Sequence, residues 1–83
     1  MYAVVVKKKA AKEIEALPKH DQRRIIASFD ILRENPFVGK QLEGEYEGAR
    51  VIRVWPYRVI YVIHRSIVTV TVLRVGQRQG VYK

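Results

Sequence analysis

The chain has 83 residues, 48% of them hydrophobic, no cysteine and a formal net charge of +8 at pH 7. This length predicts one domain over residues 1–83, and the lack of cysteine excludes disulfides and thiolate metal sites. No hydrophobic run is long enough to cross a membrane, so we expect a cytoplasmic protein without membrane contact, and the basic charge indicates a nucleic acid or an acidic protein as its partner.

The N-terminal part predicts a strand followed by a helix. Tyr2–Val6 is short and β-branched, which is typical of a strand. Ala10, Ile14 and Leu17 then follow at helical spacing, and Pro18 interrupts that pattern.

A second helix is predicted from about Lys19 to Glu34, ending before Asn35 and Pro36. Its apolar face is formed by Ile25, Ile26, Phe29 and Leu32. Because the joint between the two helices is short, we expect a helical hairpin that lies on a sheet.

The C-terminal part changes to the period of strands. Residues 37–48 contain several glycines and glutamates and are predicted to form a loop anchored by Leu42. Three strands are predicted at residues 50–55, 58–65 and 67–75, with turns at 56–57 and near 65–66. The order β-α-α-β-β-β predicts an α+β fold with a mainly antiparallel sheet packed against the helical hairpin.

The strand at 58–65 separates its side chains onto two faces. One face carries Val59, Tyr61 and Ile63, and the other carries Arg58, Ile60 and Val62. We expect the first face in the core and Arg58 on the open face. Trp55 and Tyr61 are both expected in the core, by ordinary burial preferences.

Positive charge is concentrated towards the C-terminus. Residues 1–48 hold nine Lys or Arg and eight Asp or Glu, whereas residues 49–83 hold seven Lys or Arg and no acid. Several guanidiniums on one face, together with Arg78 after the last strand, would bind phosphate, and Tyr57 and Tyr82 offer rings for an unstacked base. A structural alternative is that Arg53 pairs with a glutamate of residues 43–47 and that Arg65 and Lys83 are only solvated.

Other catalytic classes lack their usual residues. His20 and His64 lie far apart, and without cysteine they form no spaced ligand set, so we predict no metal and no cofactor. Ser28 and Ser66 have no base partner in the pattern, and there is no glycine-rich phosphate loop.

Three segments resemble one known family. Residues 53–61, RVWPYRVIY, resemble the R-x-G-D-Y-R-V-I-Y segment of the RelE/ParE superfamily of bacterial and archaeal toxins. Residues 75–82, VGQRQGVY, resemble its closing V-G-x-R…Y element, and residues 35–44 resemble its loop between the second helix and the second strand. The resemblance implies a toxin of a type II toxin–antitoxin system, held inactive by a cognate antitoxin.

For the RelE branch, the resemblance implies a metal-independent endoribonuclease that cleaves mRNA on the ribosome, giving 2′,3′-cyclic phosphate and 5′-OH ends. By position, Arg58 would hold the scissile phosphate, Arg78 would stabilise the developing charge, and Tyr82 would stack a base or move a proton. Arg53 joins this predicted catalytic set. The predicted RNA-binding set is Arg50, Tyr57, Lys83 and Lys40.

The sequence also departs from the family pattern. Residues 49–82 contain no lysine, and arginine is a poor general base, so proton abstraction from the 2′-OH is unassigned. Trp55 and Pro56 replace the usual Gly-Asp turn. Two alternatives therefore remain beside the ribonuclease: a ParE-like toxin that poisons DNA gyrase without chemistry of its own, and an inactive nucleic-acid-binding module.

Overall fold

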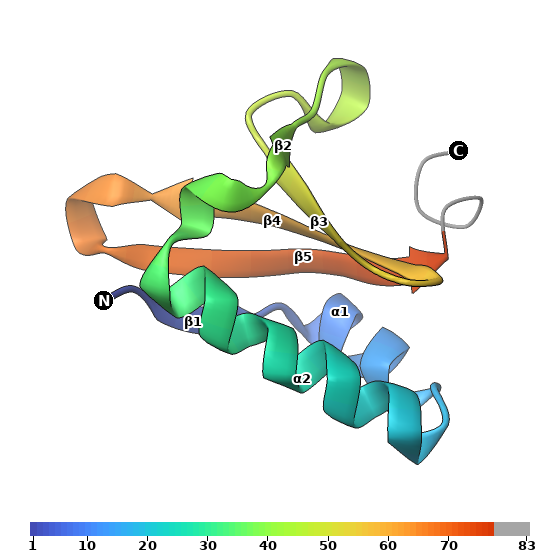
Figure 1. Cartoon of the computed structure of the whole chain (residues 1–83). Coiled ribbons are helices and arrows are strands. Elements are labelled where there is room, and N and C mark those ends of the chain that lie inside the picture. Colours follow the sequence, from blue (N-terminus) through green and yellow to red (C-terminus); the bar gives the residue numbers. More distant parts are fainter. Residues whose placement is uncertain (78–83) are drawn as a thin grey trace.

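The computed structural model describes residues 1–77, which form a five-stranded mixed sheet with two helices against one face (Figure 1). The elements are β1 Ala3–Val6, α1 Lys8–Glu15, α2 Lys19–Glu34, β2 Lys40–Gln41, β3 Arg50–Val54, β4 Tyr57–His64 and β5 Thr69–Gln77, with short 3-10 turns η1 Pro36–Val38, η2 Gly44–Tyr46 and η3 Arg65–Ile67. The sheet order is β1-β5-β4-β3-β2; β1 runs parallel to β5, and the other neighbours are antiparallel. The predicted α+β fold is confirmed. Within residues 1–77, neither helix is long and apolar enough to span a membrane.

Strand β2 is an addition to the predicted order. Its two residues, Lys40 and Gln41, lie inside the segment predicted as a loop and pair with Val51 and Arg50 at the sheet edge. Both are exposed. Two exposed polar residues show no alternation, so the sequence pattern carried no sign of this strand.

Helix α2 has the predicted ends but a different buried face. Its capping residue Asn35 accepts a hydrogen bond from the backbone N–H of Phe37 at 3.1 Å, and the helix stops there. Ile26, predicted in the core, is 52% exposed, because it lies about 100° around the helix from Ile25. Ser28 is buried instead, with its hydroxyl donating to the carbonyl of Ile25 at 2.6 Å.

Tyr61 ties the loop after α2 to the sheet. Its buried hydroxyl donates to the carbonyl oxygen of Pro36 at 2.5 Å and accepts from the N–H of Gly39 at 3.1 Å. A Cβ atom at position 39 would lie 2.2 Å from the Tyr61 Oη atom, so glycine is required for this close approach. The contact sets where β2 begins.

A bulge in β5 changes which residues share a face. Ile60 pairs with Arg74 and Tyr61 pairs with Val72, so Leu73 is the extra residue. Leu73 therefore packs with Ile60 on the face away from the helices, while Val72 before it and Val75 after Arg74 pack on the helix side. The bulge brings Leu73 and Arg74 to the same open face.

Candidate functional site

Arg53 and Arg58 lie directly opposite each other on β3 and β4. Their neighbours Ile52 and Val59 pack on the helix side, so by alternation both arginines belong to the open face of the sheet. The face predicted for Arg58 is thus confirmed. Arg53 is exposed and makes no hydrogen bond or ion pair with any residue in 1–77, so the predicted alternative of pairing with a loop glutamate is wrong.

Like charges placed opposite each other destabilise a sheet. The Arg53–Arg58 pair therefore costs stability in the free protein and favours binding of an anion at this position. On β5, Gly76 lies opposite Arg58 and adds no side chain there.

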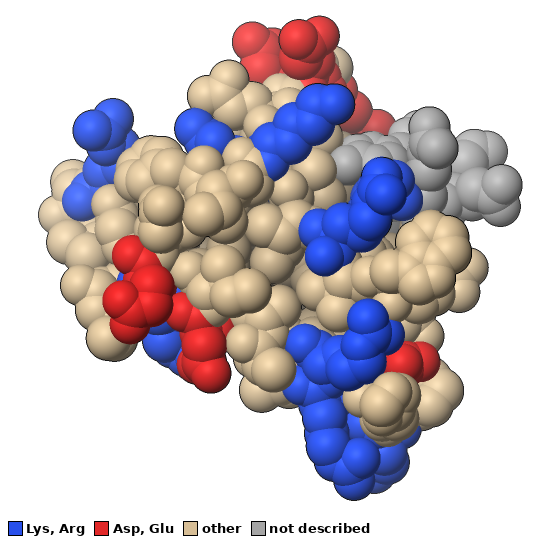
Figure 2. Space-filling view, viewed as in Figure 1, with Lys and Arg blue, Asp and Glu red and all other residues tan. Residues whose placement is uncertain are grey.

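Figure 2 shows how charge is distributed on the side of the molecule that carries β3. Lys and Arg side chains lie over the sheet and near the joint of the two helices, whereas acidic side chains lie over η2 at the top and in a second group at the lower left, over α2. The acidic residues of that loop are Glu43, Glu45 and Glu47. Lys40 is exposed and pairs with Val51, so by register it belongs to the arginine-bearing face.

The described chain ends beside the arginine pair. Gln77 is opposite Tyr57, next to Arg58. The three predicted site residues Arg78, Tyr82 and Lys83 lie outside the described residues.

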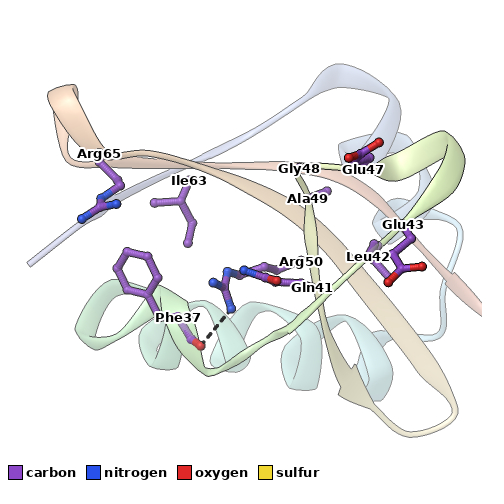
Figure 3. Close-up of a pocket in the computed structure, with 10 residues that line it drawn as sticks. All are labelled: Phe37, Gln41, Leu42, Glu43, Glu47, Gly48, Ala49, Arg50, Ile63 and Arg65. Atoms are coloured by element: carbon purple, nitrogen blue, oxygen red, sulfur yellow. Dashed lines mark hydrogen bonds between the residues drawn. The ribbon is translucent and has the colours of Figure 1, made fainter.

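Arg50 is on the other face from Arg53 and Arg58. It pairs with Tyr61, and its Nη1 atom donates to the carbonyl oxygens of Phe37 at 3.2 Å and Gly39 at 2.8 Å. Its guanidinium also lies 5.3 Å from the centroid of the Phe37 ring, with that of Arg65 at 5.7 Å. Figure 3 shows these side chains in an open pocket at the β2 edge. Arg50, which was predicted to bind RNA, therefore holds the loop after α2 and does not share a face with Arg53 and Arg58.

Tyr57 is a core residue. It is 7% exposed, packs in the cluster under the helices, and donates from its hydroxyl to Asp21 Oδ2 at 2.6 Å. The hydrogen bond to Asp21 raises the pKa of the Tyr57 hydroxyl, and burial of the hydroxyl raises it further by a smaller amount. The predicted stacking role does not fit this placement, because the ring is covered by protein.

Trp55 shows the opposite difference between prediction and structure. It was predicted in the core but is 69% exposed in the turn between β3 and β4. The alternation of the strands explains both placements: Tyr57 has the phase of the core residues Val59 and Tyr61, whereas Trp55 has the phase of the exposed Arg53 and lies in the turn Trp55-Pro56.

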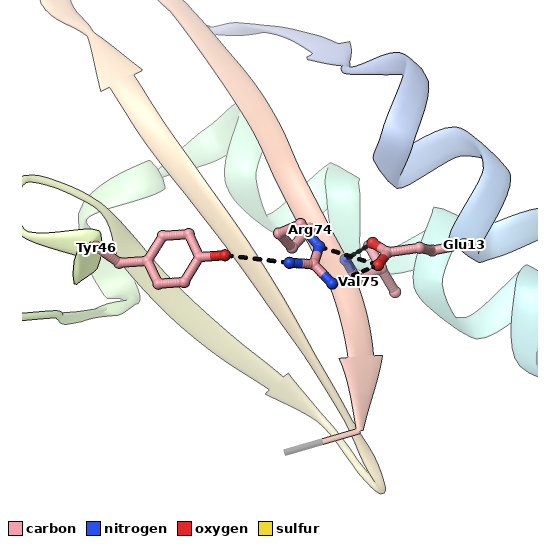
Figure 4. A network of polar contacts seen from close by, with 4 residues as sticks. All are labelled: Glu13, Tyr46, Arg74 and Val75. Carbon is pink, nitrogen blue, oxygen red and sulfur yellow. Dashed lines mark hydrogen bonds and ion pairs between the residues drawn. The ribbon is translucent and has the colours of Figure 1, made fainter. Parts of the chain in front are cut away.

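Arg74 belongs to a polar network that the sequence analysis missed (Figure 4). Its Nε and Nη2 atoms contact Glu13 Oε2 at 2.9 and 2.8 Å, and its Nη1 donates to the Tyr46 hydroxyl at 3.2 Å. Glu13 Oε1 also accepts from the backbone N–H of Val75 at 2.8 Å. The hydrogen bond to Glu13 raises the pKa of Arg74. This arginine is neutralised and links α1 to η2, so its role is structural.

Comparison with known proteins identifies the family. A model of the ParE toxin of the type II toxin–antitoxin system parDE matches residues 4–82. The chain belongs to the ParE toxin family. This toxin is therefore a member of the RelE/ParE superfamily, and the resemblance inferred from the sequence is confirmed. No sequence among curated proteins matches it.

Solved structures of toxin–antitoxin complexes share the fold of this toxin. The RelBE2 complex from Mycobacterium tuberculosis has a chain 32% identical, with a TM-score of 0.85 and coverage of 93% of this toxin and 98% of that chain. The archaeal RelE–RelB complex from Pyrococcus horikoshii has a chain that is 29% identical, with a TM-score of 0.79 and coverage of 93% of this toxin and 94% of that chain. The intact E. coli RelBE complex has a chain that is 25% identical, with a TM-score of 0.78 and coverage of 93% of this toxin and 96% of that chain. This chain is thus a toxin of a type II toxin–antitoxin system.

Proposed function

We propose that this toxin is a metal-independent endoribonuclease that cleaves mRNA on the ribosome. The observation that carries the proposal is the Arg53–Arg58 pair on the open face, because two opposed guanidiniums suit a phosphodiester. The similarity to the RelE chains of known RelBE complexes, at 32% and 29% identity, supports the same activity.

The proposed reaction needs positioning and charge stabilisation from the protein. The 2′-OH of one nucleotide attacks the adjacent phosphorus, the new O2′–P bond forms, and the P–O5′ bond breaks. The 2′-OH releases its proton to solvent and the departing 5′ oxygen takes up a proton from solvent, so the products are a 2′,3′-cyclic phosphate and a 5′-OH. Arg58 holds the scissile phosphate and Arg53 binds a second phosphoryl oxygen, which stabilises the charge of the transition state. Arg78 and Tyr82 join the reaction in this proposal, as the charge stabiliser and the base-stacking group.

The same face would bind its partners. Lys40 and Lys83 add contacts to the RNA backbone, whose phosphates attract lysine and arginine. A cognate antitoxin would neutralise the arginine pair with acidic side chains, as a protein partner does for an exposed basic surface. The ribosome, mRNA and antitoxin are thus the partners that we infer.

The match to the ParE family favours a second candidate, a toxin that inhibits DNA gyrase without cleaving RNA. In that case the arginine face would bind protein or DNA, and no bond would break.

An assay with translating ribosomes distinguishes the ribonuclease from the gyrase inhibitor. The purified toxin is incubated with the ribosomes, and the 5′ ends of the mRNA are then mapped. A gyrase supercoiling assay is run in parallel, with Arg58→Ala and Arg78→Ala variants as controls. We expect new 5′-OH ends with the wild type, none with either variant, and normal supercoiling. Intact mRNA together with inhibited supercoiling would reject the ribonuclease.

A further inference from the structure

Trp55 occupies an unusual place for a large aromatic residue. It is the first residue of the two-residue turn that joins Val54 to its partner Tyr57. The side chain is 69% exposed, whereas most tryptophans are largely buried. The turn stands at the end of the sheet where β5 finishes, since Gln77 is also opposite Tyr57. The fold therefore presents this ring to solvent instead of using it in the core.

Within residues 1–77, Trp55 is the more exposed of two exposed aromatic residues; the other, Phe37, has a ring that already lies 5.3 and 5.7 Å from the guanidiniums of Arg50 and Arg65. Arg53 precedes Trp55 by two residues. Only one residue pair, Val54 with Tyr57, separates the Arg53–Arg58 pair from the turn. Exposed Ile67, in contrast, lies at the opposite end of β4, in η3. An aromatic ring beside guanidiniums is the combination by which proteins bind single-stranded nucleic acid: bases stack on the ring and phosphates contact the charges.

We propose that Trp55 is a stacking platform for an unpaired base of single-stranded RNA, with Arg53 binding the phosphate next to that base. This inference rests on the proposed ribonuclease function and deepens it, because it places a substrate contact outside the arginine pair. Base faces are covered in a duplex, so the site selects single strands. Pro56 follows in the turn and has no backbone N–H, so the contact depends on the ring and not on hydrogen bonds from the turn.

Fluorescence tests the contact directly, because Trp55 is the sole tryptophan of the chain. The wild-type toxin is titrated with a single-stranded RNA of about 12 nucleotides, and separately with the same sequence as a duplex, at one salt concentration. We expect saturable quenching by the single strand and at least about fivefold weaker binding of the duplex. Unchanged emission, or equal quenching by both RNAs, would overturn the proposal.

Variants then measure the contribution of the ring, using the anisotropy of labelled RNA. Trp55→Ala should lose about 5- to 150-fold in affinity, the range of one base–aromatic stack, and Trp55→Phe should recover most of it. Ile67→Ala, which removes an equally exposed apolar side chain far from the turn, should bind within about twofold of the wild type. Equal affinity of Trp55→Ala and Ile67→Ala would reject the platform.

Cleavage of mRNA on ribosomes by the wild type is measured separately, so the two proposals fail independently. If the wild type cleaves mRNA but the fluorescence of Trp55 does not respond to RNA, the stacking site is rejected and the ribonuclease proposal stands. Quenching by single-stranded RNA without cleavage supports the stacking site and rejects the ribonuclease. Intact mRNA together with no response of Trp55 to RNA would reject both.

Discussion

The two faces of the sheet are covered in different ways. The helix face is closed by α1 and α2 over a continuous core, formed by Ala10, Ile14, Ile25, Phe29, Leu32, Tyr57, Val59, Tyr61, Val70, Val72 and Val75. Within residues 1–77, the cluster on the open face has two buried residues, Ala49 and Ile60, with Leu42, Tyr46, Val51, Val62 and Leu73 partly buried around them. Arg53 and Arg58 stand beyond this smaller cluster.

This difference separates stability from function. Burial of apolar area stabilises the fold, and most of it lies on the helix face. The opposed arginines add no such burial and carry repulsion in the free protein. Substitutions on the helix face should therefore change the free energy of unfolding, and those of the arginine pair should change activity.

The largest effect on stability is expected in the helix-face core. Leu32 is fully buried, so Leu32→Ala should lower the free energy of unfolding by about 2–5 kcal/mol. Ile31→Ala is the matched control on the same helix: its side chain is exposed, and the change should stay within about 0.5 kcal/mol. Urea unfolding measures both. Equal losses in the two variants would break the comparison between the faces.

A smaller effect is expected where α1 meets the edge of β5. Glu13→Ala removes the partners of Arg74 and of the Val75 N–H, and should cost about 1–2 kcal/mol, since water replaces part of what is lost. Glu15→Ala, on the exposed side of the same helix, should have little effect. If the two variants unfold at the same urea concentration, the Glu13 network does not stabilise the fold.

The smallest effect concerns alkaline pH. The raised pKa of Tyr57 means that its contribution to stability is complete below the ordinary value near 10 and is lost as the pH rises through the folded-state value. The pKa of Tyr61 is also raised, chiefly by burial, with the same sign. Tyr57→Phe should therefore lose less stability than the wild type between about pH 8 and pH 11 in chemical unfolding. Parallel curves would show that folding does not raise the pKa of Tyr57.

Much of the fold followed from local patterns. The C-terminal end of α2 was predicted from Asn35 and Pro36, and the alternation of Val59 and Tyr61 gave the core side of β4 and the face of Arg58. These features depend on strong local signals, namely proline at a helix end and period-two hydrophobicity.

The site was predicted less fully, because Trp55 was assigned to the core by the general burial preference of tryptophan and not by its phase in the strand. Trp55 has the phase of the exposed Arg53, and Tyr57 has the phase of the buried Val59. Arg50 is separated from Arg53 by three positions, which puts it on the other face, where its guanidinium contacts Phe37 and Gly39. Contacts between residues far apart in sequence, such as Arg74 with Glu13, leave no periodic signal.

The double variant Arg53→Ala/Arg58→Ala tests the central claim most directly, when mRNA cleavage on ribosomes and the free energy of unfolding are measured on one preparation. The account predicts that cleavage falls by at least about 100-fold while the free energy of unfolding changes by no more than about 1 kcal/mol. Cleavage at the wild-type rate, or a loss of activity matched by a loss of folding, would contradict it.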